Sequence, residues 1–237
     1  QYDHQVQTNT IASPEDADSA IIRIKDTNIG IGISIDGNGK TTYLNPLEGG
    51  KIAVAEACRN LICSGVEPLA ITNCLNFGDP TTQLVSHQLN ESVNGISESC
   101  NIFGIPVISG NVSLYNSTER GAIFPTPIIG AVGKINNVKS IITSKFKNYN
   151  DLVILLGSSA LSNDHNDLAG SEYLEIIHKK IAGSPRIDLE FENRLQKCCL
   201  NLINNGLIIS AHDCSEGGIA VTIAESCILS NIGFESE

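Results

Sequence analysis

The chain has 237 residues, enough for one or two domains and for a hydrophobic core without disulfide bonds. Its 15 Lys and Arg residues against 26 Asp and Glu residues give a formal net charge of −11, and charged residues make up only 17%. This balance argues against a broad basic face for nucleic acid or an anionic membrane, and against a disordered acidic tail.

The first predicted elements follow a polar arm. Residues 1–18 are polar and partly acidic, which predicts a linker. Strands are predicted over 20–25 and 29–36, where β-branched residues are frequent. In the second strand isoleucines alternate with small residues, which predicts that the isoleucine side is buried. These isoleucines are Ile29, Ile31, Ile33 and Ile35. A turn with Asp36 exposed is predicted over 36–39.

The strongest helical pattern spans residues 48–64, where apolar side chains recur at helical spacing. Gly49 and Gly50 near its start would let another backbone or a ligand come close. A strand is predicted over 68–75, and a second helix over 86–103 is ended by glycine and proline.

The remaining elements divide around a segment rich in Lys and Asn at 134–150, which marks a domain boundary. The predictions are strands over 107–109, 128–132, 152–156 and 207–211, a glycine-bearing loop over 110–121, a helix from about 171, and helices over 188–205 and 216–229. We expect a linker over 1–18, an N-terminal domain over 19–137 and a truncated C-terminal domain over 138–237. The absence of Met, of an apolar leader and of a long apolar run predicts a fragment or processed chain without signal peptide or spanning helix.

A polar motif at 107–116 directly follows an apolar strand pattern. Gly110 permits close backbone approach, while Asn111 and Ser113 offer neutral oxygens to a metal ion or a phosphate-bearing ligand. On spacing alone a polar turn explains the same residues, so both readings stay open.

The segment 71–78 has the same character, with Asn73 and Asn76 at the end of an apolar run. A buried Asn without partners costs about 1–3 kcal/mol. We expect these side chains either to cap backbone groups or to face a ligand.

The segment 211–218 is predicted to join a strand to a helix. Asp213 and Glu216 fit a capping box, and a ligand-facing helix start is the alternative. His212 and Asp213 would point to opposite faces of a strand, which makes them a poor catalytic pair. Ser171 is predicted to cap the helix that follows it.

Several catalytic patterns are missing from the sequence. The segment 36–41 is not a phosphate-binding loop, because Ser34 stands where glycine is required and Pro46 interrupts the helix that should follow. We find no defensible Ser/His/Asp or Cys/His arrangement. The eight cysteines form no CxxC pair and match no zinc spacing, which predicts reduced thiols in a cytoplasmic protein.

Together, five motifs in order resemble the synthetase subunit of the phosphoribosylformylglycinamidine synthase family. They lie at 2–10, 48–57, 65–72, 107–116 and 211–218, and the resemblance runs over about residues 1–230. The opening segment is similar to the small, multi-subunit form, in which a separate glutaminase subunit and a small accessory subunit complete the complex.

The resemblance implies the aminoimidazole-ribonucleotide-synthetase-like α/β fold. An α+β N-terminal (A) domain would be followed by a partial α/β C-terminal (B) domain, and the chain would be the second half of a subunit with two such copies. The implied reaction uses ATP and glutamine-derived ammonia to convert formylglycinamide ribonucleotide to formylglycinamidine ribonucleotide, with Mg²⁺ at the phosphates.

The resemblance also implies roles for particular residues. The positions of Asn73 and Gly110 contact ATP, that of Asn111 ligates Mg²⁺, and that of Ser113 contacts the substrate ribonucleotide. Asn73 replaces the usual Asp, which removes a negative charge near the nucleotide. The family's catalytic His belongs to the first half, so this chain is assigned no catalytic residue and is expected to be inactive alone.

Two alternatives stay open. One is another ATP-using enzyme of the superfamily, such as aminoimidazole ribonucleotide synthetase, selenophosphate synthetase or thiamine-phosphate kinase. The other is a non-catalytic nucleotide-binding or scaffold fragment. In the implied topology the A-domain sheet packs on that of the first half, so the isolated chain is expected to hide its apolar face in a homodimer.

Overall fold

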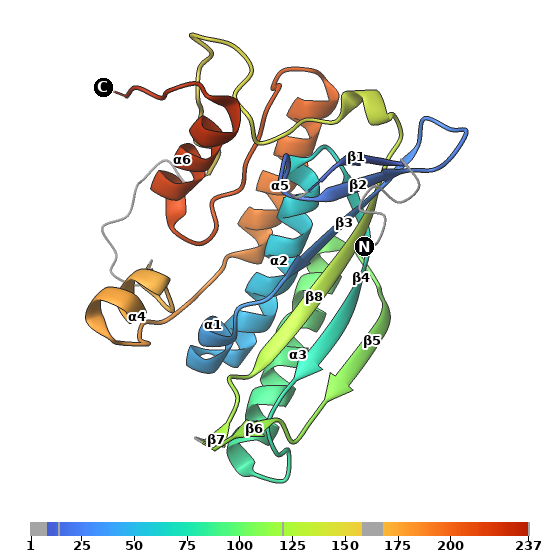
Figure 1. Cartoon of the computed structure of the whole chain (residues 1–237). Coiled ribbons are helices and arrows are strands. Elements are labelled where there is room, and N and C mark those ends of the chain that lie inside the picture. Colours follow the sequence, from blue (N-terminus) through green and yellow to red (C-terminus); the bar gives the residue numbers. More distant parts are fainter. Residues whose placement is uncertain (1–8, 14, 120, 158–167, 237) are drawn as a thin grey trace.

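The computed structural model describes residues 9–13, 15–119, 121–157 and 168–236. A six-stranded sheet lies beside a layer of helices, as Figure 1 shows. The strands are β1 (Thr10–Ala12), β2 (Ala20–Arg23), β3 (Gly30–Asp36), β4 (Glu67–Asn76), β5 (Val107–Ser113), β6 (Ser117–Thr118), β7 (Gly121–Ala122) and β8 (Thr126–Ile135). The helices are α1 (Gly39–Leu44), α2 (Pro46–Cys63), α3 (Gln83–Phe103), the 3-10 turn η1 (Val138–Ser140), α4 (Glu172–His178), α5 (Leu189–Asn204) and α6 (Gly218–Ser230).

The sheet has the strand order β1-β2-β3-β8-β4-β5. Neighbours are antiparallel except β4 and β5, which are parallel and joined by the crossover helix α3. A parallel pair requires such a crossover because its two strands start at the same end of the sheet. The polar ends of β4 and β5 therefore meet at one edge, where the sequence motifs of both strands lie.

Helix α2 confirms the strongest sequence prediction. Asn45 caps its start by accepting a hydrogen bond from the backbone of Glu48, and proline occupies its first turn. A Cβ at Gly49 would lie 2.5 Å from the Cα of Thr42, and one at Gly50 would lie 2.3 Å from a carbonyl oxygen of α3. The two glycines therefore let the backbones of α1 and α3 approach α2, as predicted.

The alternation in β3 is real, but the prediction that its isoleucine side is buried is wrong. Gly30, Gly32 and Ser34 face the helix layer, where the Ser34 hydroxyl donates to the carbonyl of Ala57 at 2.6 Å. A Cβ at Gly32 would lie 2.7 Å from the side chain of Val66, so only small residues fit there. The isoleucines at 31, 33 and 35 lie on the opposite face, and Ile35 is 71% exposed. Among the described residues, no helix covers that face (Figure 1).

Near β3 and β5 the structure differs from the sequence predictions in two further places. The predicted turn at 36–39 leads directly into α1, because Asn38 accepts hydrogen bonds from the backbones of Lys40 and Thr41. The predicted loop over 110–121 is partly strand, since β5 continues to Ser113 and β6 pairs with β7.

Helices α4, α5 and α6 confirm the helices predicted in the C-terminal part, although α6 begins at Gly218. Ser171 caps α4 as predicted, by accepting a hydrogen bond from the backbone of Leu174. The strands predicted over 152–156 and 207–211 do not form in the described structure. Leu152 is 90% exposed, and the second segment makes a single bridge between Thr143 and Ser210. A strand needs a continuous row of backbone hydrogen bonds to a neighbour, and beyond this one bridge the described residues provide none for these segments.

The main core lies between the sheet and helices α2 and α3, where Leu61, Ile71, Phe77 and Ile129 are fully buried. A smaller apolar cluster joins the end of α2 to α5. None of the helices in the described ranges combines the length and apolar character needed to cross a bilayer.

Candidate functional site

Asn73 and Gly110 sit opposite each other on the neighbouring parallel strands β4 and β5. A Cβ at position 110 would lie 2.3 Å from the side-chain oxygen of Asn73, so glycine here lets the Asn73 side chain keep this position. Asn73 also lines a cavity of about 270 Å³ between α3 and the start of β5, with Ser97 and Asn101 as further polar residues. Asn73 therefore faces the helix layer.

Asn111 and Ser113 lie on the other face of the sheet, because alternate residues of a strand point to opposite sides. The Asn111 amide donates to the sulfur of Cys74 at 3.4 Å, and the Ser113 hydroxyl contacts the side-chain oxygen of Asn116 at 3.3 Å. The structure thus brings the four predicted site residues onto two neighbouring strands but onto two different faces.

Two other asparagines of these motifs satisfy backbone groups. The Asn116 amide donates to the carbonyls of Phe77 at 3.1 Å and Ser113 at 2.9 Å, which holds the end of β5 against β4. The Asn76 amide donates to the carbonyl of Thr126 at 3.2 Å. For Asn76 the capping interpretation is therefore correct, and the hydrogen bonds of Asn116 fit the polar turn that was the alternative for the segment 107–116.

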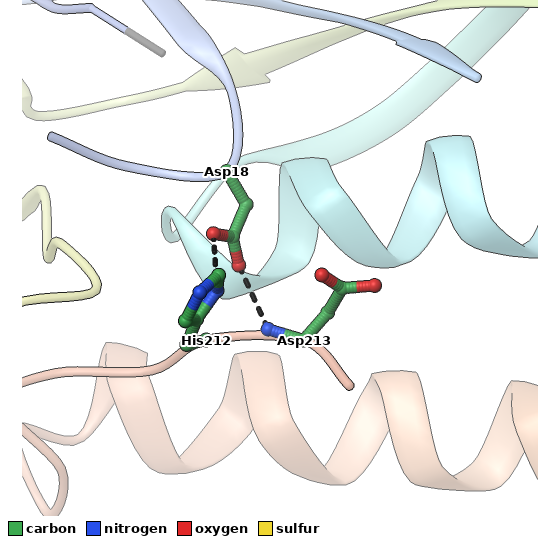
Figure 2. Close-up of side chains that lie close together, drawn as sticks. All are labelled: Asp18, His212 and Asp213. Carbon is green, nitrogen blue, oxygen red and sulfur yellow. Dashed lines mark hydrogen bonds and ion pairs between the residues drawn. The ribbon is translucent and has the colours of Figure 1, made fainter. Parts of the chain in front are cut away.

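Figure 2 shows a second polar group formed by Asp18, His212 and Asp213. The Nδ1 atom of His212 lies 2.7 Å from one carboxylate oxygen of Asp18, and the backbone N–H of Asp213 donates to the other at 2.9 Å. Potential ligand atoms of all three side chains lie within 4.8 Å of one another.

This geometry corrects two predictions for the segment 211–218. Asp213 does not cap α6, because the N-cap is Gly217 and the Asp213 carboxylate instead pairs with Nε of Arg59 at 3.3 Å. The segment is not a strand, so His212 and Asp213 both reach Asp18. The hydrogen bond to Asp18 raises the pKa of His212 to about 9.

Further carboxylates gather around Arg59 on α2. Its Nη1 atom lies 2.7 Å from Glu192 of α5, while Asp36 and Glu56 interact with it electrostatically. Burial raises the pKa of Asp36 to about 6, and burial together with the charge of Asp36 raises that of Glu56 to about 8. Burial also raises the pKa of Asp213. Such mutually perturbed carboxylates are typical of functional sites.

Sequence reasoning missed this acidic group. It placed Asp18 in a linker and Asp36 on an exposed turn, whereas Asp36 is half-buried and accepts a hydrogen bond from Asn60 at 3.2 Å. The available signal was the helical spacing of Glu56 and Asn60, which places an acid and an amide one turn apart on α2.

Comparison with known proteins identifies both parts of the chain. Residues 16–135 match the AIR synthase related protein, N-terminal domain, and residues 149–237 match its C-terminal domain. The chain is 49% identical over 238 residues to the phosphoribosylformylglycinamidine synthase subunit PurL of Alkaliphilus metalliredigens, covering 100% of this chain and 31% of that protein. The corresponding protein of Moorella thermoacetica is 46% identical over 238 residues, which cover 100% of this chain and 32% of that protein. The chain therefore spans about a third of these relatives.

Solved structures agree with this relationship. Thermotoga maritima PurL complexed with FGAR matches with a TM-score of 0.63 and 28% identity over 95% of this chain and 32% of that one. The ATP complex of the same protein matches with a TM-score of 0.52 and 34% identity, and the match covers 56% of this chain and 22% of that one. Both the sequence matches and the shared architecture show that this chain belongs to the family of AIR synthase related proteins.

Proposed function

We propose that this chain is part of the synthetase subunit of a phosphoribosylformylglycinamidine synthase, which uses ATP and glutamine-derived ammonia to form formylglycinamidine ribonucleotide. The observation that carries the proposal is the 49% identity to a PurL protein over 100% of the chain. The structure of AaThiL, another relative in fold, shares only 15% identity and therefore supports the fold alone.

The chain contributes a portion of the active site, and the remaining two thirds of the subunit supply the rest. Thermotoga maritima PurL has been solved with ATP and with FGAR, which supports ATP and formylglycinamide ribonucleotide as ligands here. In the proposed assignment Asn73 and Gly110 contact ATP and Ser113 contacts the ribonucleotide. Asn73 and Gly110 share one sheet face, whereas Asn111 shares the other with Ser113, so the Mg²⁺ ligand proposed from the resemblance lies on the same face as the proposed ribonucleotide contact.

The acidic group provides a second, independent fit to Mg²⁺. Asp18 and Asp213 offer carboxylate oxygens within 4.8 Å of each other, and Glu56 interacts with Asp213 through its charge. Carboxylate oxygens are the hard ligands that this ion prefers. Burial and neighbouring negative charges raise the pKa values of Glu56 and Asp213. A divalent cation would neutralise part of this negative charge. Mg²⁺ neutralises phosphate charge when it is bound. Asn111 on β5 remains the Mg²⁺ ligand that the family resemblance implies.

The exposed isoleucine face of β3 is the proposed contact with the first half of the subunit. It is the apolar sheet face that the described helices leave uncovered. In the isolated chain a second copy would cover it and produce a homodimer. The Thermotoga maritima PurLQS structure supports the glutaminase and the small subunit as further partners, and the free cysteines support a cytoplasmic location.

An assay with ammonia, Mg-ATP and formylglycinamide ribonucleotide tests the proposal. Phosphoryl transfer depends on positioning and charge neutralisation, so we expect no turnover from this chain alone and turnover once the remaining part of the subunit is added. The remaining part alone is the matched control. Failure of the combined, folded parts to form the amidine would reject the proposed function.

A further inference from the structure

Helix α4 lies beside the start of α1 and is tied to it by one lysine (Figure 1). The Lys40 ammonium forms ion pairs with both Glu172 and Glu175. These two acids stand three positions apart and therefore share one face of α4. The Lys40 side chain is only 17% exposed, so the two carboxylates and their surroundings cover most of it.

Hydrophobic burial does little to hold α4 in this place. The helix has seven residues, and none of them is buried. None of the other helices and strands in the described part of the chain packs extensively against it. Tyr173, Ile176 and Ile177 are each more than half exposed. Because a helix this short is not stable alone in water, its order depends on being held against α1.

The segment that carries α4 is closed at its base. The backbone N–H of Gly170 donates to the carbonyl of Ala182 at 3.0 Å, and a Cβ at Gly183 would lie 2.5 Å from the Cα of Ala169. Gly170 and Gly183 have φ values of +69° and +111°, which glycine adopts without strain. Residues 169–183 therefore form a loop with a glycine at each side of its base.

This base is anchored to the helices below it. A Cβ at Gly170 would lie 3.2 Å from the hydroxyl oxygen of Thr41, the residue after Lys40. Beyond the loop, the backbone N–H of Ile187 donates to the carboxylate of Glu48 on α2 at 2.8 Å. The loop can therefore turn about its base while the chain that follows it stays in place.

We propose that residues 169–183 form a flap over the start of α1, and that Lys40 is the electrostatic latch that holds this flap closed. Asn38, two residues before Lys40, donates to the side chain of Glu216 at 3.0 Å, and Asp36 of the acidic group precedes it by two more. Opening of the flap would expose the Lys40 ammonium in the segment that follows Asp36. The flap thus controls access to this end of α1.

Hydrogen exchange of the 237-residue chain, read by mass spectrometry over α4, tests the latch. The N–H of Lys179, which donates to the carbonyl of Glu175 at 3.0 Å, is one of the amides that the closed flap protects. In K40M these amides should exchange about three- to tenfold faster at low salt, the effect expected of two exposed ion pairs. K40R should keep the protection. About 1 M NaCl, which screens charges beyond about 3 Å, should speed exchange in the wild type but not in K40M.

Lys51 supplies the matched control, because it also pairs with two glutamates, Glu48 and Glu98. K51M should leave exchange in α4 unchanged, and exchange in β4 reports whether each variant is folded. The double variant E172Q/E175Q removes the latch from the flap side and leaves α1 intact, so it decides the test if K40M does not fold.

Three results would overturn the proposal. The first is unchanged exchange of α4 in the folded latch variants. The second is an equal rise in K51M, and the third is a salt response in K40M as large as in the wild type.

Discussion

The carboxylate of Asp18 accepts the backbone N–H of Asp213 at 2.9 Å, which joins positions 195 residues apart. The other oxygen of the same carboxylate lies 2.7 Å from His212. One side chain before β2 therefore holds the segment that leads into α6. This junction is one of several that connect the part of the chain containing the sheet to the C-terminal helices, together with the ion pairs of Arg59 to Glu192 and Asp213.

The pH dependence of stability should report this junction. The pKa of His212 is raised from 6.5 to about 9, so its contribution is fully present below about pH 6.5 and is lost as the pH rises through about 9. The contribution is on the order of 1–3 kcal/mol. Thermal unfolding in EDTA across this range should show the loss, and D18N should flatten it. An equally steep profile in D18N would contradict the assignment.

Gly110→Ala should destabilise the β4–β5 pair by about 1 kcal/mol, because the new methyl group would meet the side-chain oxygen of Asn73 and force that side chain to shift. Chemical denaturation provides the measurement. Gly157→Ala is the control, since nothing lies within 4 Å of a Cβ there. The double variant carrying Asn73→Ala as well should recover part of the loss, and no recovery would show that the contact is not the cause.

Glu56→Gln should weaken stabilisation of the chain by Mg²⁺, because it removes a negative charge that interacts with Asp213. In the wild-type chain a concentration of 100 times Kd would raise the free energy of unfolding by about 2.7 kcal/mol. The pKa of Glu56 is raised to about 8, so its negative charge develops as the pH rises through this value and Mg²⁺ should bind more strongly there. Thermal shift against Mg²⁺ concentration is the measurement. Glu91→Gln on α3, where the carboxylate accepts a hydrogen bond from Asn94, should keep the full response.

Asn111→Ala in the complete synthetase should lower ATP-dependent turnover by more than about tenfold, or about 1.4 kcal/mol. The amide oxygen is a neutral, hard ligand that alanine cannot replace. Steady-state assays at saturating Mg²⁺ decide this prediction, with Asn94→Ala on the exposed surface of α3 as the control. Unchanged turnover would remove Asn111 from the proposed site.

Ile33→Asp should convert the isolated chain from a dimer to a monomer, because a charge on the open sheet face would be buried without a partner on association. Light scattering at protein concentrations on the order of 10 μM measures the mass of the particle. Ile228→Asp on the exposed surface of α6 is the matched control and should leave the dimer intact. A wild-type monomer would reject the proposed self-association.

Local patterns made much of this fold predictable. The helix expected over 48–64 forms over Pro46–Cys63, and Ser171 caps α4 as expected. Capping bonds and helical periodicity act between residues a few positions apart, so the sequence alone carries them. The ordered motifs likewise indicate the family from the sequence alone.

The isoleucine row of β3 and the Asp18 junction depended on tertiary structure. Alternation determines that β3 has two different sides, but the close approach of α2 decides that Gly30, Gly32 and Ser34 face the helices. Similarly, a strand prediction separated His212 from Asp213, whereas the folded segment lies unpaired and both residues reach Asp18. Most helices could be predicted from the sequence because capping and periodicity act over short range, and the order of the motifs indicated the family. Only the packing decided which face is buried and which distant charges meet, because those energies arise when separate elements come into contact.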